Sequence, residues 1–436
     1  MGMTAPTPRA PDDRSVADAA FRRAAWRVMP LMLACYVAAY LDRVNVGFAK
    51  LQMSNALHFS DAVYGLGAGL FFIGYFLFEV PSNLLLHRVG ARRWIARIMI
   101  SWAVVSMAAA WVSSPTGFYV VRFVLGIAEA GFFPGMILYL TQWFPAQRRG
   151  RMTALLMSGN PLSGIIGGPV SGAIMHFYSG VGGLGGWQWL FILEALPALV
   201  LGVVVHRHLD DRIDGATWLD EAGKAAMQRE LAADAALHRI GSVRASFASA
   251  RVWLLCLILF GIVMGSYTIG FWQPTIIRNS GVSDPLAVGL LTMLPYVTAL
   301  IAMLLVSRSA DRTHERRWHV SAPALLGAAG FGICALSIDR LIPSMLGLCL
   351  AAAGVISALP MFWALPTAFL GGRGAAAGIA WINSIGNLAG FVGPALLGLL
   401  ITRSHSLAAG LYLVAGTLTV AAVLIVSLMP ARLVDR

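Results

Sequence analysis

The sequence RVGARRW at residues 88–94 recurs as RTHERRW at residues 312–318. The first arginine, the last two arginines and the tryptophan match, all at a single offset of 224 residues. In each half of the chain the segment follows the second of a series of apolar stretches. A match of four residues at one offset indicates an internal duplication. We therefore expect two similar halves that are joined by a connecting segment.

The apolar stretches on either side of this repeat predict a membrane protein. The chain has 436 residues, of which 58% are hydrophobic and 12% are charged, with a mean hydropathy of +0.74. A stretch of about 20 apolar residues is long enough to cross a hydrocarbon core of roughly 30 Å. We predict an all-α membrane protein with twelve transmembrane helices in two pseudo-symmetric six-helix halves. The expected spans are 28–49, 62–86, 94–113, 116–141, 152–176, 188–206, 251–278, 285–307, 318–338, 341–369, 374–402 and 406–429.

The polar segments divide the chain into five parts. We expect a cytoplasmic tail at 1–27, a first half at 28–206, a cytoplasmic linker at 207–250, a second half at 251–429 and a short cytoplasmic tail at 430–436. The first 27 residues include acidic residues and no apolar core, which is unlike a cleaved signal peptide.

The basic residues predict the orientation in the membrane. With both termini in the cytoplasm, 26 of the 32 Lys and Arg lie at the inner face, as the positive-inside rule requires. The exceptions are four at the outer face, Lys50, Arg278, Arg340 and Arg403, and two within spans, Arg43 and Arg122. We expect a multi-pass membrane protein with both termini in the cytoplasm. Because the net charge of +12 is spread over alternating short loops, we expect no nucleic-acid binding.

A second repeat supports the duplication. Gly159–Asn160 precedes Gly168–Pro169 in the fifth span, and Gly386–Asn387 precedes Gly393–Pro394 in the eleventh. Parallel repeats about an axis along the membrane normal are typical of some secondary transporters, whose substrate lies near the midplane between the halves.

Several segments carry a family resemblance. RVGARRW and ADRTHERRW resemble the loop signature of the major facilitator superfamily, although His87 stands where Asp is usual and Asn83 where Gly is usual. Within it the chain resembles the anion:cation symporter family, in its bacterial tartrate, phthalate and hydroxyphenylacetate branch. The segments that carry this resemblance are YLDRVNVGFAKLQM, YFLFEVPSNLLLHRVGARRWIARIMISW, RFVLGIAEAGFFPGMILYLTQWFP and FWALPTAFLGGRGAAAGIAWINSIGNLAGFVGP. The resemblance implies a carrier of organic anions and protons in the bacterial inner membrane. We expect a monomer that lies in lipid and needs no cofactor or metal.

Charged residues within the spans are the first candidates for function. A charge at the bilayer centre costs at least roughly 2.5–3.5 kcal/mol, so such residues need a reason to be there. Arginine binds carboxylates through a planar fork, which makes Arg43 the candidate anion anchor. Asp42 and Glu129 are candidate proton carriers whose affinity Arg122 would adjust, and depth estimates allow Asp42 and Arg122 to pair. A static ion-pair network that holds the helices together is the alternative for all four.

Two further acids favour structural roles. Glu194 lies near the outer end of the sixth span, and Glu79 lies near the inner face, where we expect it to pair with loop arginines. The predicted cytoplasmic gate comprises Glu79, Arg88, Arg92, Asp311 and Arg312.

Polar and aromatic residues in the spans are candidates for lining a substrate cavity. Amides bind hydroxyl and carboxylate oxygens, and aromatic rings form flat walls. The same residues could instead make helix-packing contacts. The candidates are Asn45, Tyr75, Asn160, Tyr267, Trp272, Gln273, Trp363, Asn383 and Asn387.

These observations predict a proton-coupled symporter that imports an organic carboxylate by alternating access, its two halves rocking about a central site. The alternatives are a proton-independent anion exchanger and a membrane sensor that binds a ligand without moving it. We expect no enzyme, because the sequence has no nucleophile elbow, phosphate-binding loop or metal-ligand cluster.

Overall fold

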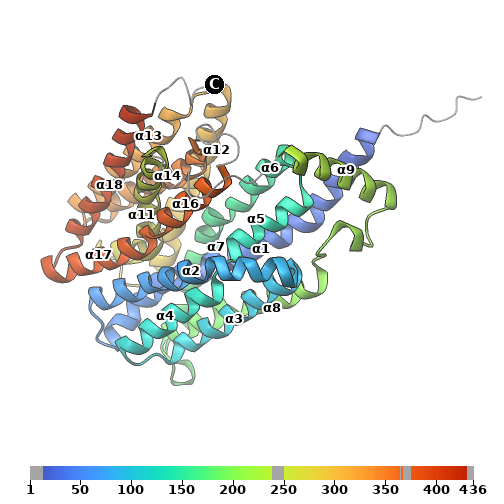
Figure 1. Ribbon diagram of the computed structural model, residues 1–436. Coiled ribbons are helices and arrows are strands. Elements are labelled where there is room, and N and C mark those ends of the chain that lie inside the picture. The colour runs from blue at the N-terminus through green and yellow to red at the C-terminus, as the bar shows by residue number, and fades with distance from the viewer. Residues whose placement is uncertain (1–12, 238–249, 364, 367–374, 430–436) are drawn as a thin grey trace, which may run out of the picture.

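The computed structural model describes residues 13–237, 250–363, 365–366 and 375–429, and in these residues all regular structure is helical. Two helical bundles lie side by side, one coloured blue to green and the other yellow to red (Figure 1). The first bundle comprises α1 (Asp13–Ala56), α2 (Asp61–Val89), α3 (Ala91–Ala108), α4 (Pro115–Glu129), α5 (Phe132–Trp143), α6 (Ala146–Met157), α7 (Gly159–Phe177) and α8 (Gly186–His208).

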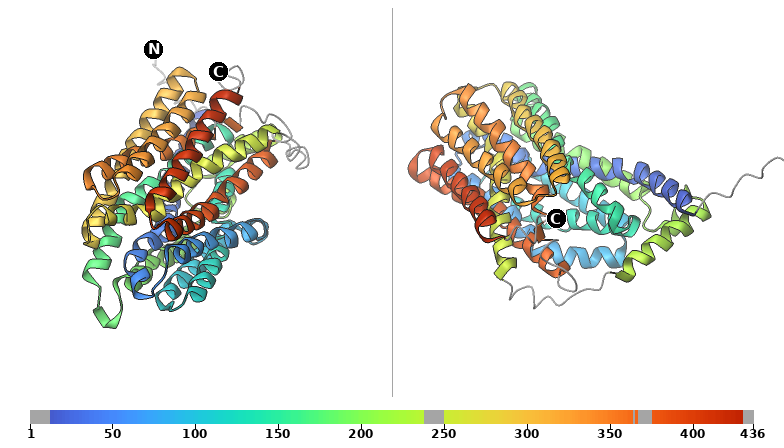
Figure 2. Two further views of the ribbon diagram at one scale, coloured as in Figure 1. Left: turned by 90° about the vertical axis from the view of Figure 1, so that its left-hand side faces the viewer. Right: turned by 90° about the horizontal axis from the view of Figure 1, so that it is seen from above.

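The second bundle follows a connecting segment that contains α9 (Glu221–Leu237). It comprises α11 (Ala250–Asn279), α12 (Pro285–Thr313), α13 (Arg317–Leu336), α14 (Leu341–Phe362), α16 (Ala375–Asn387), α17 (Ala389–Ser404) and α18 (Leu407–Leu428). We call the end of the molecule where α8 ends and α11 begins the linker side, and the end where α2 and α12 begin the far side. Figure 2 shows the two bundles from two further directions.

Three of the spans are made of two helices each. α4 and α5 meet at Gly131, whose φ of 81° suits glycine, and a Cβ there would lie 2.5 Å from Ser82 Oγ. α6 and α7 meet at Ser158, and α16 and α17 meet at Leu388, but both residues keep helical dihedral angles. Each of the last two pairs is a span that is divided into two helices at one residue, and we call these the irregular spans. They are the fifth and eleventh spans, in which the sequence repeats.

Twelve spans result, as the sequence predicts. Eleven described helices are long and apolar enough to cross a membrane. The twelfth is α7, in which glycines, serines and prolines dilute the apolar residues. Small residues in a membrane helix allow close packing, so α7 gains contact where it lacks hydropathy.

Side-chain caps start several helices on the far side. Ser60, Ser114, Asp284 and Ser406 accept hydrogen bonds from backbone N–H groups in the first turns of α2, α4, α12 and α18. At Asp284 the N–H of Ala287 and the His176 ring lower the pKa of the carboxyl. These caps satisfy N–H groups that have no partner within the helix.

The two bundles touch through glycine on the far side. α7 packs on α12, and α2 packs on α17. A Cβ at Gly289 would lie 2.3 Å from Gly168 O, and one at Gly398 would lie 2.2 Å from Asp61 O. Only residues without a side chain allow these backbones to approach so closely.

Candidate functional site

An ion pair between Arg43 of α1 and Glu129 of α4 lies at the centre of the molecule. The Arg43 side chain is 13% exposed and that of Glu129 is 1% exposed. The guanidinium carbon also lies 5.3 Å from the ring centre of Phe71 and 5.5 Å from that of Tyr75. Cation–π contacts of this kind strengthen when water is excluded. The positive charge of Arg43 and the negative charge of Glu129 therefore neutralise each other in a site with almost no access to water.

Arg43 also contacts the other half of the molecule. Its Nη1 lies 3.5 Å from the hydroxyl oxygen of Tyr267 on α11. The two residues are 224 positions apart, which is the offset of the sequence repeat. Equivalent residues of two repeats can meet only close to the axis that relates the repeats. The Arg43–Tyr267 contact therefore marks the pseudo-symmetry axis, where the two halves face each other.

A cavity of about 100 Å³ surrounds this contact. A buried water needs roughly 10–15 Å³ of such volume, so the cavity has room for several waters or a small polar ligand. Seven of the residues proposed as substrate-binding line it, namely Arg43, Tyr75, Asn160, Tyr267, Trp363, Asn383 and Asn387. Asn160 and Asn387 come from the two irregular spans, one in each half.

Other lining residues are not evident from the sequence patterns considered above. Tyr36, Tyr40 and Arg43 of α1 are spaced by four and three residues, so they form one face of the helix. Ser266 precedes Tyr267 on α11 and adds a hydroxyl group. Reading backward from Arg43 at helical spacing would have found the two tyrosines.

Three predicted lining residues lie elsewhere. The Asn45 amide donates to Asp42 Oδ1 over 3.3 Å, and the Gln273 amide donates to Thr292 O over 3.0 Å. Trp272 is fully buried against Tyr64. Asn45 is two positions beyond Arg43 and thus about 200° around the helix, and Trp272 and Gln273 lie more than one turn beyond Tyr267. These residues pack helices and do not line the cavity with Arg43.

The neighbouring acid, Asp42, faces away from the cavity. Its Oδ1 accepts a 2.5 Å hydrogen bond from Ser106 of α3, and its Oδ2 is buried with no partner among the described residues. Arg122 is 1% exposed, and its Nε and Nη2 also find no partner there. The suggested Asp42–Arg122 pair therefore does not form in this conformation. The guanidinium carbon of Arg122 lies 5.2 Å from the centre of the Phe71 ring, which Arg43 also contacts.

The sequence and the fold can now be compared with known proteins. Residues 32–394 match the Major Facilitator Superfamily. The chain belongs to this superfamily. It is 48% identical over 420 residues to the metabolite transport protein NicT of Pseudomonas putida, covering 96% of both chains. It is 49% identical to a protein of Agrobacterium vitis that carries the name tartrate transporter, covering 92% of this chain and 90% of the relative.

A solved structure agrees on the fold. The xylose transporter XylE from E. coli has a TM-score of 0.73 at 15% identity, covering 93% of this chain and 98% of that one. At this identity the likeness concerns architecture alone. Membership of the superfamily establishes a multi-pass membrane transporter and not an enzyme.

Among the predicted gate residues, Glu79 lies in a different place from the one expected, which was beside the arginines of the loop. It lines the central cavity, and among the described residues it forms no ion pair with Arg88. Arg92 instead bonds to the connecting segment after α8, its backbone N–H donating to Asp211 Oδ1 over 2.8 Å.

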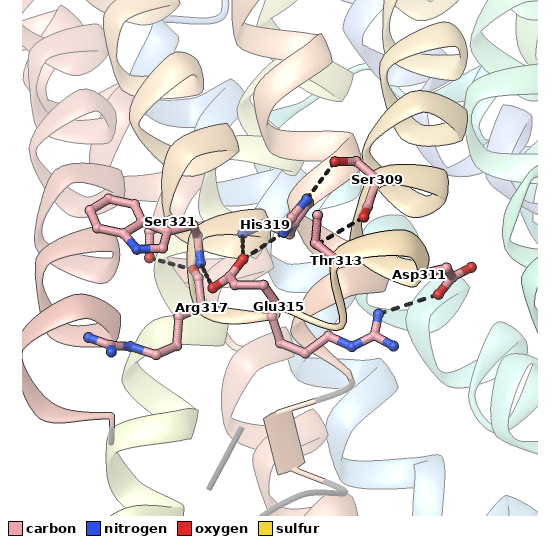
Figure 3. A network of polar contacts seen from close by, with 9 residues as sticks. Ser309, Asp311, Thr313, Glu315, Arg317, His319 and Ser321 are labelled. Carbon is pink, nitrogen blue, oxygen red and sulfur yellow. Dashed lines mark hydrogen bonds and ion pairs between the residues drawn. The ribbon is translucent and has the colours of Figure 1, made fainter. Parts of the chain in front are cut away.

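The equivalent loop of the second half bonds within itself instead (Figure 3). Asp311 pairs with Arg316 at 3.5 Å, and Glu315 accepts the N–H of Trp318 over 2.6 Å. Arg88 and Arg312 are exposed. In the described part of the chain no ion pair joins the two loops, so the predicted gate residues do not close the linker side in this conformation.

Sequence reasoning missed a buried cation on the far side. The sequence predicts Lys50 at the outer face, just beyond the first span, but not that it is buried: α1 continues to Ala56, and Lys50 is 7% exposed. It pairs with Asp61 at 2.7 Å and lies 4.2 Å from the ring centre of Trp272. It also donates to Thr275 of the other half over 3.3 Å. Lys50 therefore joins the two halves on the far side.

Proposed function

We propose that this protein imports an organic carboxylate together with protons by alternating access. The observation that carries the proposal is the Arg43–Glu129 ion pair in a cavity between the halves. An arginine that is already neutralised by a glutamate can exchange that partner for the carboxylate of a substrate. The pair thus offers both an anion site and a titratable group.

Exchange of partners on Arg43 would couple the two ligands. When a substrate carboxylate takes the guanidinium, Glu129 remains buried without its cation. An unpaired anion in such a place costs far more than a protonated acid that can form a hydrogen bond. Glu129 therefore takes up a proton as the substrate binds, and loses it when the substrate leaves and the pair forms again.

Asp42 and Arg122 occupy a second layer behind this pair. Within the described residues, Asp42 has one buried oxygen without a partner, and Arg122 has two buried nitrogens without one. We assign them to the proton route, because a proton on Asp42 or a shift of Arg122 would alter the field at Glu129. The amides of Asn160, Asn383 and Asn387 and the rings of Tyr75, Tyr267 and Trp363 are the proposed substrate contacts.

We assign the linker side to the cytoplasm, because the basic residues concentrate there. The far side is held by close glycine contacts and by Lys50, whereas the cavity extends toward the linker side through Glu79, Met157 and Leu359. This conformation corresponds to the inward-facing state of the proposed cycle.

The test is uptake by purified protein in liposomes under an imposed pH gradient. A thermal-shift screen would first rank L-tartrate, a sugar acid and an aromatic carboxylate such as benzoate, since the relatives suggest tartrate and the cavity walls are aromatic. The best ligand should accumulate against its own gradient when the outside is acidic. Collapse of the pH gradient with a protonophore should abolish that accumulation.

Glu129→Gln separates the proton role from substrate binding. The variant should still exchange labelled for unlabelled substrate across the membrane but should not accumulate it. Uphill accumulation by this variant would contradict the assigned role. Exchange without any pH-driven uptake by the unmodified protein would favour a proton-independent exchanger, and binding without flux would favour a sensor.

A further inference from the structure

A second hollow lies away from the central cavity, between the first turns of α1 and the helix α6. These helices contact each other near the linker side (Figure 1). The groove between them has a volume of about 840 Å³. Its walls include Arg22, Trp26, Pro30 and Leu33 of α1, and Arg151 and Leu155 of α6.

Both walls change from basic to apolar in the same direction. On α1 the groove face runs from Arg22 through Trp26 and Pro30 to Leu33, at spacings of four, four and three residues. On α6 it runs from Arg151 to Leu155, again four residues apart. Both helices begin on the linker side, so the arginines lie together at one end of the groove and the apolar side chains at the other.

The depth of this change matches the bilayer surface. Arg22 precedes the predicted start of the first span, residue 28, by six residues, or about 9 Å of helix. Leu33 lies about 7 Å inside that point. The polar layer on each side of the hydrocarbon core is several Å thick. The groove therefore has its arginines at the level of the head groups and its apolar end at the level of the acyl chains.

The arginines of the groove differ in what they already bind. Arg148 pairs with Asp18 and lies 3.6 Å from Glu230, and its guanidinium lies 4.5 Å from the Phe21 ring. Arg22 and Arg151 are exposed, and neither forms an ion pair within the described residues. Two guanidinium groups at the basic end thus retain their donors for another anion.

The apolar surface of the groove is also uncovered. Trp26 is 78% exposed and Leu155 is 43% exposed. Tryptophan is enriched at membrane interfaces, where its ring lies at the level of the head groups. A ligand that combines an anionic head with an apolar tail would satisfy both ends of the groove, whereas an inorganic anion would leave the apolar end bare.

We propose that this groove is a binding site for an anionic phospholipid, with its phosphate on Arg22 and Arg151 and an acyl chain along Leu33 and Leu155. The inference goes beyond transport and rests on the proposed orientation only in assigning the lipid to the cytoplasmic leaflet. Arginines near an anionic membrane surface attract its lipid head groups. Because the lipid touches α1 and α6 together, it would hold the extended start of α1 against the bundle.

The test is native mass spectrometry of the full-length protein with phosphatidylglycerol, phosphatidylcholine or inorganic phosphate. Phosphatidylglycerol should bind at least roughly tenfold more tightly than phosphatidylcholine, and the double variant Arg22→Gln/Arg151→Gln should lose roughly that factor. The matched control is Arg207→Gln/Arg308→Gln, which removes two exposed charges from the linker side outside the groove. It should retain phosphatidylglycerol binding within about twofold, because neither arginine lines the groove.

The conservative double variant Arg22→Lys/Arg151→Lys should keep most of the preference, since the charge is retained. Equal losses in the groove pair and the control pair would overturn the site in favour of diffuse surface charge. Equal binding of the two lipids would overturn it as well. The proposal would also be overturned if inorganic phosphate bound as tightly as phosphatidylglycerol, or if the protein formed a dimer and no lipid adduct. Either result would mean that the groove binds something other than a phospholipid.

Discussion

The two halves of this transporter share a fold but not a distribution of charge. The spans of the first half contain Asp42, Arg43, Glu79, Arg122, Glu129 and Glu194. In the part that the structure describes, the spans of the second half carry charge only at their ends, at Arg251 and Arg278. At the repeat offset of 224 residues, Arg43 corresponds to Tyr267, Asp42 to Ser266 and Glu129 to Ala353. The two halves share their helices but none of these three charges.

This difference suggests a division of work. Buried charges are costly, and a group that changes partners must be held by residues that tolerate both states. The first half would bind the anion and the proton, while the second half would supply a neutral wall of hydroxyl, amide and aromatic groups. The two meet at Arg43 and Tyr267, so substitutions on either side of that contact test the division.

The largest effect is expected for Arg43→Ala, which leaves Glu129 buried and unpaired. Breaking a buried pair from one side costs about 3–5 kcal/mol. Uptake into liposomes should fall more than a hundredfold, and the thermal midpoint should drop.

The double variant Arg43→Leu/Glu129→Leu tells a functional pair from a structural one. Apolar residues of similar size often restore the stability lost with a buried pair. We expect its thermal midpoint to recover while transport stays absent. If the double variant transported normally, the pair would serve only to hold α1 against α4.

Next in size is Gly289→Ala, which tests the interface between the halves. The added Cβ would lie 2.3 Å from Gly168 O, so the backbones must separate. Overpacking of this kind costs about 1–3 kcal/mol. The thermal midpoint should fall, and exchange should slow because the far side no longer closes. Gly416→Ala is the control, since a Cβ there meets nothing within 4 Å; an equal loss in both would show that the interface is not the cause.

The sequence predicted the spans because hydropathy and helix length are local properties. It also placed Arg43 and Glu129 within the membrane, since charge in an apolar stretch is conspicuous. The repeat offset adds a relation between distant residues, which hydropathy and charge do not provide. It pairs Arg43 with Tyr267 as equivalent residues, and the fold shows them in contact on the axis.

Which side chains of a span point into the central cavity could not be predicted in the same way. One residue turns a helix by about 100°, and tertiary packing decides which face meets the cavity. For this reason Asn45 and Gln273 were assigned to the cavity and lie outside it, while Tyr36 and Tyr40 line it. The burial of Lys50 could not be predicted either, because it depends on contacts with Asp61 and with Thr275 of α11 that no local signal marks.

A moderate effect is expected for Asp42→Asn, because this acid lies behind the cavity wall. Asparagine can still accept the hydrogen bond from Ser106, so the fold should be kept. Uphill accumulation should fall by roughly tenfold, equivalent to about 1.4 kcal/mol, while exchange stays within twofold. Measuring both in the same liposomes isolates the proton step. Unchanged accumulation would leave Asp42 as a purely structural acid and Glu129 as the proposed coupling group.

The smallest effect is expected for Tyr267→Phe, on the neutral side of the contact. The hydroxyl lies 3.5 Å from Arg43 Nη1, which is long for a hydrogen bond, and the ring also packs edge-on against Phe72 at 4.4 Å. Phenylalanine keeps that packing, so the cost should be at most about 1 kcal/mol, or a few-fold in substrate affinity with coupling intact. A few-fold loss of affinity, read from the concentration dependence of uptake, would mean that the second half only shapes the site. A loss as large as that of Arg43→Ala would instead show that the hydroxyl shares the anion with the guanidinium, and the division between a charged half and a neutral half would no longer hold.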